Sequence, residues 1–155
     1  MVKIHEMRSR DVEAVSVLEA KAFSMPWSAK AFAQLIEDSK SLYLVAELEG
    51  EIVGCCGVTN ICGDGDINNV VVAEKQQGRG IAQALLQELL KRGEERGIEN
   101  FTLEVRVSNA PAIHIYEKLG FVSEGIRPRF YEKPVEDAMI MWKRKERSAG
   151  ITRCI

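Results

Sequence analysis

The sequence predicts one mixed α/β domain in which helices alternate with strands along the chain. Its 155 residues are the length of one ordinary domain, and 46% of them are hydrophobic, enough for a substantial core. Strand-like and helix-like segments follow one another in the order β-α-α-β-β-β-α-β-α-β-β. The run Val70-Val71-Val72 is too continuous for a strand with one solvated face, so it indicates burial on both faces.

The N-terminal part is predicted to form a strand and two helices. Residues Val2–Met7 read as the first strand. Ser9 is expected to cap a helix, because apolar residues recur after it at helical spacing. The segment Pro26-Trp27-Ser28 interrupts that pattern, and Ser28 is expected to cap a second helix that runs to about Glu37.

Three strands are expected next. They cover Leu42–Leu48, Ile52–Asn60 and Ile67–Val72. The turn residues Glu49-Gly50-Glu51 join the first two as a hairpin, and Gly63-Asp64-Gly65 is expected to turn the chain into the third.

The C-terminal part is predicted to hold two helices and three strands. A long helix with one apolar stripe runs to about Arg96, and Gly97 ends it. The remaining elements are a strand at Phe101–Val105, a helix at Ala110–Leu119, a strand that starts at Gly120-Phe121, and a last strand at Ala138–Trp142. We expect a single domain over residues 1–145 and an irregular tail over 146–155.

Charge and hydropathy exclude several classes of protein. There are 21 Lys and Arg residues against 23 Asp and Glu, a net charge of -2, which argues against a sequence-independent grip on nucleic acid. A basic protein or peptide remains compatible as a partner. No apolar run is long enough for a membrane span, and the charged segment Met1–Arg10 is unlike a signal peptide, so a cytoplasmic protein is expected.

The four cysteines are expected to be small reduced hydrophobes. Cys55 and Cys56 are neighbours on a predicted strand, so they point to opposite faces and do not chelate together. Neither they nor Cys62 and Cys154 form a pair with zinc-ligand spacing, and we expect no metal site.

A glycine-containing loop opens the long helix. The segment Gln77-Gly78-Arg79-Gly80-Ile81-Ala82 follows the strand that holds Val70-Val71-Val72. A helix N-terminus offers unpaired N–H groups to a pyrophosphate, and glycines let the backbone approach the phosphates closely. Taken alone, the segment reads equally well as a tight strand–helix turn.

A second motif, taken with the first, is specific. Residues Leu103-Glu104-Val105-Arg106-Val107-Ser108-Asn109 run from a strand into a loop, and Ala112, Tyr116 and Gly120-Phe121 follow. Together with Gln77-x-x-Gly80-x-Ala82, this pattern resembles the GNAT superfamily of N-acetyltransferases over nearly the whole chain. The resemblance implies a central mixed, mostly antiparallel sheet of about seven strands flanked by about four helices.

Further segments resemble one subfamily. These are Pro26-Trp27-Ser28, Arg129-Phe130-Tyr131 and Glu136-Asp137-Ala138-Met139-Ile140-Met141, and they are similar to the bacterial ribosomal-protein-alanine N-acetyltransferases. That resemblance implies an acceptor that is the N-terminal alanine of a small-subunit ribosomal protein. We also expect a monomer or weak dimer without direct contact with nucleic acid or membrane.

The resemblance also implies roles for individual residues. Glu104 matches the general base and Tyr116 the general acid. Trp27 and Tyr131 match positions that line the acceptor groove. The remaining matches all concern acetyl-CoA as cosubstrate: Val70, Val71 and Val72 for the pantetheine arm, Gln77, Gly78, Arg79, Gly80, Ile81, Ala82 and Gln83 for the pyrophosphate, and Asn109 for the arm.

The residue types suit this chemistry without the resemblance. Acyl transfer to an amine needs a base for the amine proton, a donor for the developing oxyanion, and a proton for the departing thiolate. Glu104 at a strand end, an N–H near Val72, and Tyr116 on the next helix suit these three roles.

Several alternatives stay open at this point. Glu104 could simply pair with Arg106, and Tyr116, Trp27 and Tyr131 could be ordinary core residues. The acceptor could instead be a lysine side chain or a small-molecule amine, or the domain could bind acyl-CoA without turnover.

Overall fold

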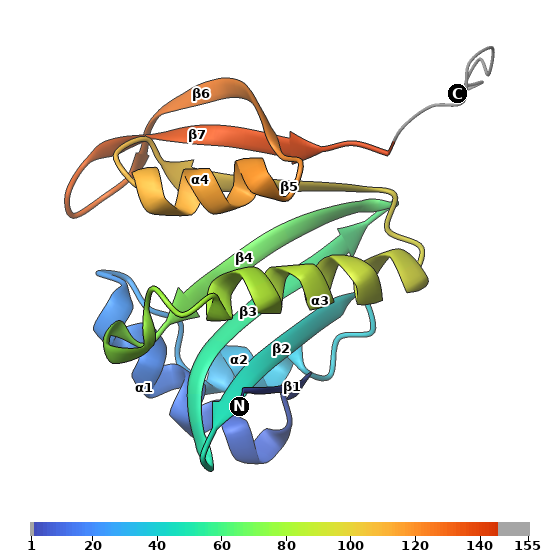
Figure 1. The fold of residues 1–155 in the computed structure, drawn as a ribbon, viewed down its shortest axis with the longest axis vertical. Helices are drawn as coiled ribbons and strands as arrows, with labels where there is room; N and C mark the ends of the chain where they lie inside the picture. Colours follow the sequence, from blue (N-terminus) through green and yellow to red (C-terminus); the bar gives the residue numbers. More distant parts are fainter. Residues whose placement is uncertain (1, 146–155) are drawn as a thin grey trace.

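Within residues 2–145, which a computed structural model describes, the protein forms a mixed seven-stranded sheet with four α-helices (Figure 1). The strands are β1 Lys3–Glu6, β2 Ser41–Leu48, β3 Glu51–Ile61, β4 Asp64–Val72, β5 Asn100–Arg106, β6 Val122–Tyr131 and β7 Glu136–Lys143. The helices are α1 Val12–Ala22, α2 Ala29–Leu35, α3 Ile81–Glu95 and α4 Ala110–Lys118. The predicted fold class and element order are confirmed, whereas the predicted tail at 146–155 lies outside the described residues.

The strand order in the sheet is β1-β2-β3-β4-β5-β7-β6. All neighbouring strands are antiparallel except β4 and β5, which are parallel. No helix within residues 2–145 is long and apolar enough to span a membrane.

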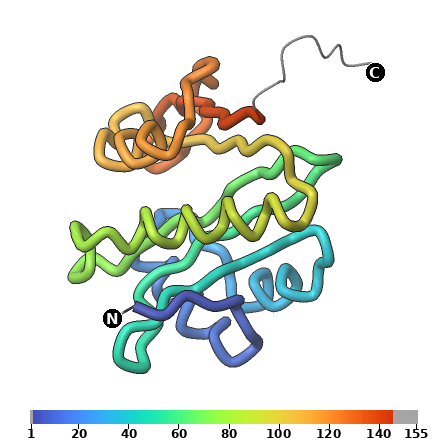
Figure 2. Tube along the Cα trace, turned by 45° about the vertical axis from the view of Figure 1, so that its right-hand side comes forward, coloured from blue at the N-terminus to red at the C-terminus, as the bar shows by residue number. Residues whose placement is uncertain are grey.

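Two apolar clusters lie on opposite faces of the sheet. One packs under α1 and α2, and the other packs under α3 and α4, so β2, β3 and β4 are covered on both faces (Figures 1 and 2). Cys55 belongs to the first cluster and Cys56 to the second, which confirms that the two thiols point to opposite faces. α4 lies over β5 and β7 (Figure 1), and the C-terminal part of α3 contacts β5 at Phe101.

Local capping explains where the N-terminal helices begin. The Ser28 hydroxyl accepts a hydrogen bond from the Ala31 N–H at 3.2 Å, so Ser28 caps α2 as expected. The expected cap at Ser9 is wrong. Residues Ser9–Asp11 form a 3-10 turn in which the Asp11 carboxylate accepts from the Arg8 N–H at 2.9 Å, and α1 starts only after it.

The parallel contact between β4 and β5 is short. It joins only three residue pairs, from Asp64 with Asn100 to Asp66 with Thr102, and beyond these pairs the strands diverge (Figure 1). At Gly65 a Cβ atom would lie 2.8–3.0 Å from side chains of Val58, Ile98 and Phe101, so the close approach of the strands requires glycine there. We call this three-pair contact the clasp.

The position of the turn before β4 differs from the sequence prediction. Gly63-Asp64-Gly65 was expected to form the turn, because glycine and aspartate favour turns. Instead β4 begins at Asp64, since it and Gly65 pair with both β3 and β5. The turn is one step earlier, where Cys62 and Gly63 adopt φ angles of 53° and 93°.

A β-bulge interrupts β4 at Asn69. The register between β3 and β4 shifts between Cys55 and Gly57, and Asn69 adopts a φ angle of 59°. The extra residue reverses the facing of the strand, so Ile67 packs in the cluster under α3 while Val71 packs in the cluster under α1. Val70 and Val72 pack against the cluster under α3, on the other face from Val71. The run Val70-Val71-Val72 is therefore buried on both faces, as predicted.

Candidate active site

A cavity of about 920 Å³ lies where β4 and β5 diverge beyond the clasp. The connection between α1 and α2 borders it on one side, through Phe23, Met25 and Trp27, and the connection between β6 and β7 borders it on another. Six residues that the sequence singled out line it together: Trp27, Val70, Glu104, Asn109, Tyr116 and Tyr131. The others, Val71, Val72 and the segment from Gln77 to Gln83, do not line it.

Glu104 lies on the face of β5 opposite the one that packs into the core. The alternation of the strand sends Leu103 and Val105 into the core, and Glu104 to the other face. Partial burial raises the pKa of its carboxyl group, and the nearby Asp66 charge raises that pKa further, while Arg127 lowers it. Glu104 is therefore a stronger base than a solvated glutamate.

The ion pair of Glu104 is with Arg127 of β6, at 3.0 Å between Oε2 and Nη1. The alternative pairing with Arg106 does not occur. Arg106 instead donates to the backbone carbonyls of Glu132 and Pro134, forms an ion pair with Glu136, and stacks 4.4 Å from the centre of the Tyr131 ring. It thereby fixes the β6–β7 connection that borders the cavity.

Tyr116 projects from α4 into the wall of the same cavity. Its ring is largely buried and packs edge-on against Phe121, with ring centres 5.9 Å apart. Burial raises the pKa of its hydroxyl group above the ordinary value, so the group stays protonated at neutral pH. Because Tyr116 lines the cavity, its hydroxyl group is a proton donor for a ligand bound there.

The start of α3 suits an anionic ligand. Gly78 and Gly80 adopt φ angles of 80° and 79°, and the space that a Cβ would occupy at each is open. Within the part of the chain that the structure describes, no side chain caps this end of the 15-residue helix, so its first N–H groups have the unpaired geometry that binds phosphate. The Gln77 amide has another partner, since it donates to the Val72 carbonyl at 3.2 Å.

The other predicted residues have structural contacts as well. The Asn109 side chain accepts from the Ala112 N–H at 3.3 Å and so caps α4. The Trp27 ring lies 5.7 Å from that of Phe32 and is 36% exposed at the cavity rim. Burial, with the Glu104 charge, raises the pKa of Tyr131 to about 12.

No cluster within residues 2–145 has the side chains to hold a metal ion.

Sequence reasoning missed a buried polar network behind the cavity. The Asn69 amide donates to Glu19 Oε1 at 2.7 Å, and its carbonyl oxygen accepts from the Tyr43 hydroxyl at 3.1 Å. Glu19 is 2% exposed, its Oε2 atom lacks a partner among the described residues, and burial raises its pKa. The network ties α1 to the bulge of β4. The one sequence signal for this network is that Glu19 interrupts the apolar residues that recur at helical spacing in α1.

Arg127 and Asp66 were also missed. Asp66 lies in the clasp, and Arg127 lies on β6, two strands away from β5 in the sheet order. Their proximity to Glu104 depends on the strand order, so no local pattern indicates it.

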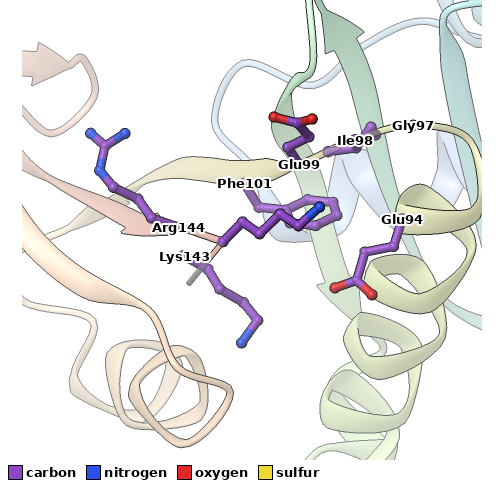
Figure 3. A pocket seen from close by; sticks show the side chains of 8 residues that line it. Glu94, Gly97, Ile98, Glu99, Phe101, Lys143 and Arg144 are labelled. Carbon is purple, nitrogen blue, oxygen red and sulfur yellow. The ribbon is translucent and has the colours of Figure 1, made fainter. Parts of the chain in front are cut away.

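A second cavity, of about 490 Å³, lies at the opposite end of β5 (Figure 3). Its lining includes Phe101, two carboxylates, Glu94 and Glu99, and the basic side chains of Lys143 and Arg144. None of the residues predicted from the sequence lines it. The larger cavity is therefore the candidate active site.

Comparison with known proteins gives a consistent result. The family described as "Acetyltransferase (GNAT) family" matches residues 12–121. The [ribosomal protein bS18]-alanine N-acetyltransferase of Escherichia coli (strain K12) is 34% identical over 145 residues, which cover 91% of this chain and 96% of that protein.

Solved structures agree in fold. The crystal structure of the ribosomal-protein-S18-alanine N-acetyltransferase from Escherichia coli superposes with a TM-score of 0.87 at 30% identity, covering 99% of this chain and 100% of that one. A variant of the spermidine N-acetyltransferase from Vibrio cholerae gives 0.78 at 20% identity, with 92% and 94% covered. The second likeness concerns the fold alone.

Proposed function

The chain belongs to the acetyltransferase (GNAT) family, and from this premise we propose that it transfers an acetyl group from acetyl-CoA to a protein N-terminal α-amine. The proposed acceptor is the N-terminal alanine of a small-subunit ribosomal protein, which would place the reaction in the cytoplasm. The support for the acceptor is the likeness in sequence and structure to proteins with that activity in their names.

One observation carries the proposal. The cavity beyond the clasp has Glu104 from β5 and Tyr116 from α4 in its lining, and open connections border it on two sides. A base and an acid therefore face one space that a peptide end and a thioester can enter from different directions.

Glu104 acts as general base in this proposal. It takes a proton from the α-amine, directly or through one water, as the amine nitrogen attacks the carbonyl carbon of the thioester. Its raised pKa favours that transfer, because a more basic carboxylate accepts the proton more readily. A backbone N–H group near Val72, past the last pairing of β4 with β5, would stabilise the developing oxyanion.

Tyr116 acts as general acid. When the carbon–sulfur bond breaks, its hydroxyl donates to the departing sulfur, which would otherwise leave as an unprotected thiolate. Its raised pKa keeps the proton in place until the sulfur carries negative charge. Acetyl-CoA supplies the activated acetyl group, and the open start of α3 at Gly78 and Gly80 would hold its pyrophosphate.

The preference for an α-amine has a physical basis. An α-amino group has a pKa near ~7.8 and lysine near ~10.4, so at about pH 7.4 roughly a quarter of α-amines but only about 0.1% of lysines are neutral. The difference is a few-hundredfold, or about 3 kcal/mol, in favour of the α-amine. One glutamate suffices to complete that smaller deprotonation.

The test is mass spectrometry after incubation with acetyl-CoA and two peptides. One peptide has a free N-terminal alanine and no lysine, and the other has a blocked N-terminus and one lysine. Acetylation of the first peptide alone supports the proposal. Acetylation of the second alone would reassign the protein to lysine side chains, and modification of neither would contradict protein acetylation.

A further inference from the structure

Arg127 is the direct partner of the proposed base in the free protein. Its Nη1 atom lies 3.0 Å from Glu104 Oε2, and its guanidinium group lies 5.2 Å from the centre of the Phe130 ring, which lines the cavity. The arginine therefore binds the carboxylate that the reaction needs for the acceptor amine.

This contact is weakly anchored. The Arg127 side chain is 55% exposed and belongs to β6, the edge strand, where nearly every residue is exposed. By contrast Arg106 is held by two backbone carbonyls, a carboxylate and a ring. Because the Arg127 side of this pair is exposed to solvent, another cation can replace the guanidinium group at small cost.

Charge matching points to the replacement. An acceptor α-ammonium group carries the same charge as the guanidinium group and has to reach the same carboxylate. Asp66 contributes a second negative charge near both Glu104 and Arg127. When the Arg127 guanidinium group moves away, the Glu104 and Asp66 carboxylates still attract a positively charged group to this place.

We propose that Arg127 is a specificity-determining residue that occupies the place of the acceptor amine on Glu104 and that a cationic amine displaces. This rests on the proposed function. Because the exchange replaces one cation with another, the acceptor amine binds in its protonated form. Glu104 then removes the proton in place, which costs less for an α-ammonium group than for a lysine.

The groups that face Glu104 are few. They are Asp66 from β4, Arg127 from β6 and Tyr131 at the end of β6, whereas its partner on β7 is the uncharged Ile140. Of these, only Arg127 lowers the pKa of Glu104, so its loss shifts the titration of this carboxyl group to higher pH.

The experiment compares Arg127→Gln and Arg127→Lys with a matched control, Arg144→Gln. Arg144 is 53% exposed and forms an equivalent pair with Glu124 of β6 at 2.7 Å, away from the larger cavity. Carboxyl ¹³C NMR follows the titration of Glu104 in the free protein, assigned by the signal missing in Glu104→Gln. Calorimetry with CoA present measures the affinity for the alanine peptide.

Arg127→Gln should shift the Glu104 titration to higher pH and bind the peptide about two- to fivefold more tightly, the range that loss of one exposed ion pair allows. Arg127→Lys should stay close to the wild type because it keeps the charge, and Arg144→Gln should change neither quantity. Unchanged or weaker peptide binding by Arg127→Gln overturns the proposal.

Failure of the proposed function would look different. If the wild type neither binds nor acetylates either peptide, the proposed function fails, and the displacement of Arg127 falls with it. If the wild type acetylates the alanine peptide and Arg127→Gln binds it no more tightly, only the displacement is overturned.

Discussion

The two arms of the sheet, β1–β4 before the clasp and β5–β7 after it, are built differently. In the first arm β2 and β3 are buried over most of their length, because α1 and α2 cover one face and α3 the other. In the second arm β5 alternates between buried and half-buried residues, and β6 is exposed. A doubly covered arm offers a rigid backbone edge, whereas a singly covered arm can carry Glu104, Arg106 and Arg127 on its open face.

The largest expected effect tests the open face of the second arm. Glu104→Gln should lower kcat about a thousandfold at neutral pH, with partial recovery at high pH where the amine deprotonates without help. The measurement is a pH–rate profile with the alanine peptide. Glu124→Gln, which removes a carboxylate from the equivalent pair with Arg144, is the control and should behave as the wild type. A mutant profile with the wild-type shape would rule out Glu104 as base.

The next effect compares the stability of the arms. Leu89→Ala in α3 removes a fully buried side chain and should lower the free energy of unfolding by about 3 kcal/mol. Ile126→Ala on β6 removes one that is 49% exposed and should cost less than about 0.5 kcal/mol. Urea unfolding measures both. Equal losses would mean that a partner covers β6 in solution.

Tyr116 tests whether the buried side of the second arm takes part in chemistry. Tyr116→Phe should slow acetyl transfer about a hundredfold, since only the proton donor is lost. Affinity for acetyl-CoA, measured by calorimetry, should stay close to that of the wild type because the ring remains packed against Phe121. Equal turnover in mutant and wild type would reduce Tyr116 to a core residue.

The loop before α3 tests whether the first arm holds the cosubstrate. Gly80→Ala and Gly50→Ala place a side chain on similar backbone, with φ angles of 79° and 83°, and each should cost about 1 kcal/mol of stability. Only Gly80→Ala should also weaken acetyl-CoA binding, about tenfold, because Gly50 lies in the turn between β2 and β3. A similar loss of affinity in both would indicate a general effect of backbone strain.

The smallest effect concerns the buried carboxyl group of the first arm. Burial raises the pKa of Glu19 in the folded chain, so its protonated form stabilises the fold at acid pH. That stability is lost as pH rises through the folded pKa. The unfolding free energy of Glu19→Gln, minus that of the wild type, should therefore increase from acid to neutral pH. A difference independent of pH would contradict the raised pKa.

In both arms the sequence predicted the order of helices and strands better than the pairing between strands. Hydrophobic periodicity is local, so the order of helices and strands and the cap at Ser28 could be predicted. Local patterns misplaced the start of β4, because pairing with two neighbours overrode the turn preference of Asp64 and Gly65. The bulge at Asn69 depends on the same pairing and left no local signal.

For the site, motif spacing predicted Glu104 and Tyr116, which line one cavity, although their roles stay predictions. The partner of Glu104 could not be predicted in the same way. Arg106 is two residues away in sequence, whereas Arg127 reaches Glu104 because β7 lies between β5 and β6 in the sheet. A contact that depends on the order of strands in the sheet cannot be predicted from the residue pattern of a single segment.

The clasp has a consequence for how the protein can be divided. The first arm ends with α3 at Glu95 and the second begins with β5 at Asn100, so within residues 2–145 the chain passes from one arm to the other only once. A break at Gly97 would cut no helix or strand. The gene could then be split there and the two polypeptides co-expressed. Their reassembly would report how strongly the three-pair contact and the packing around Phe101 hold the halves together.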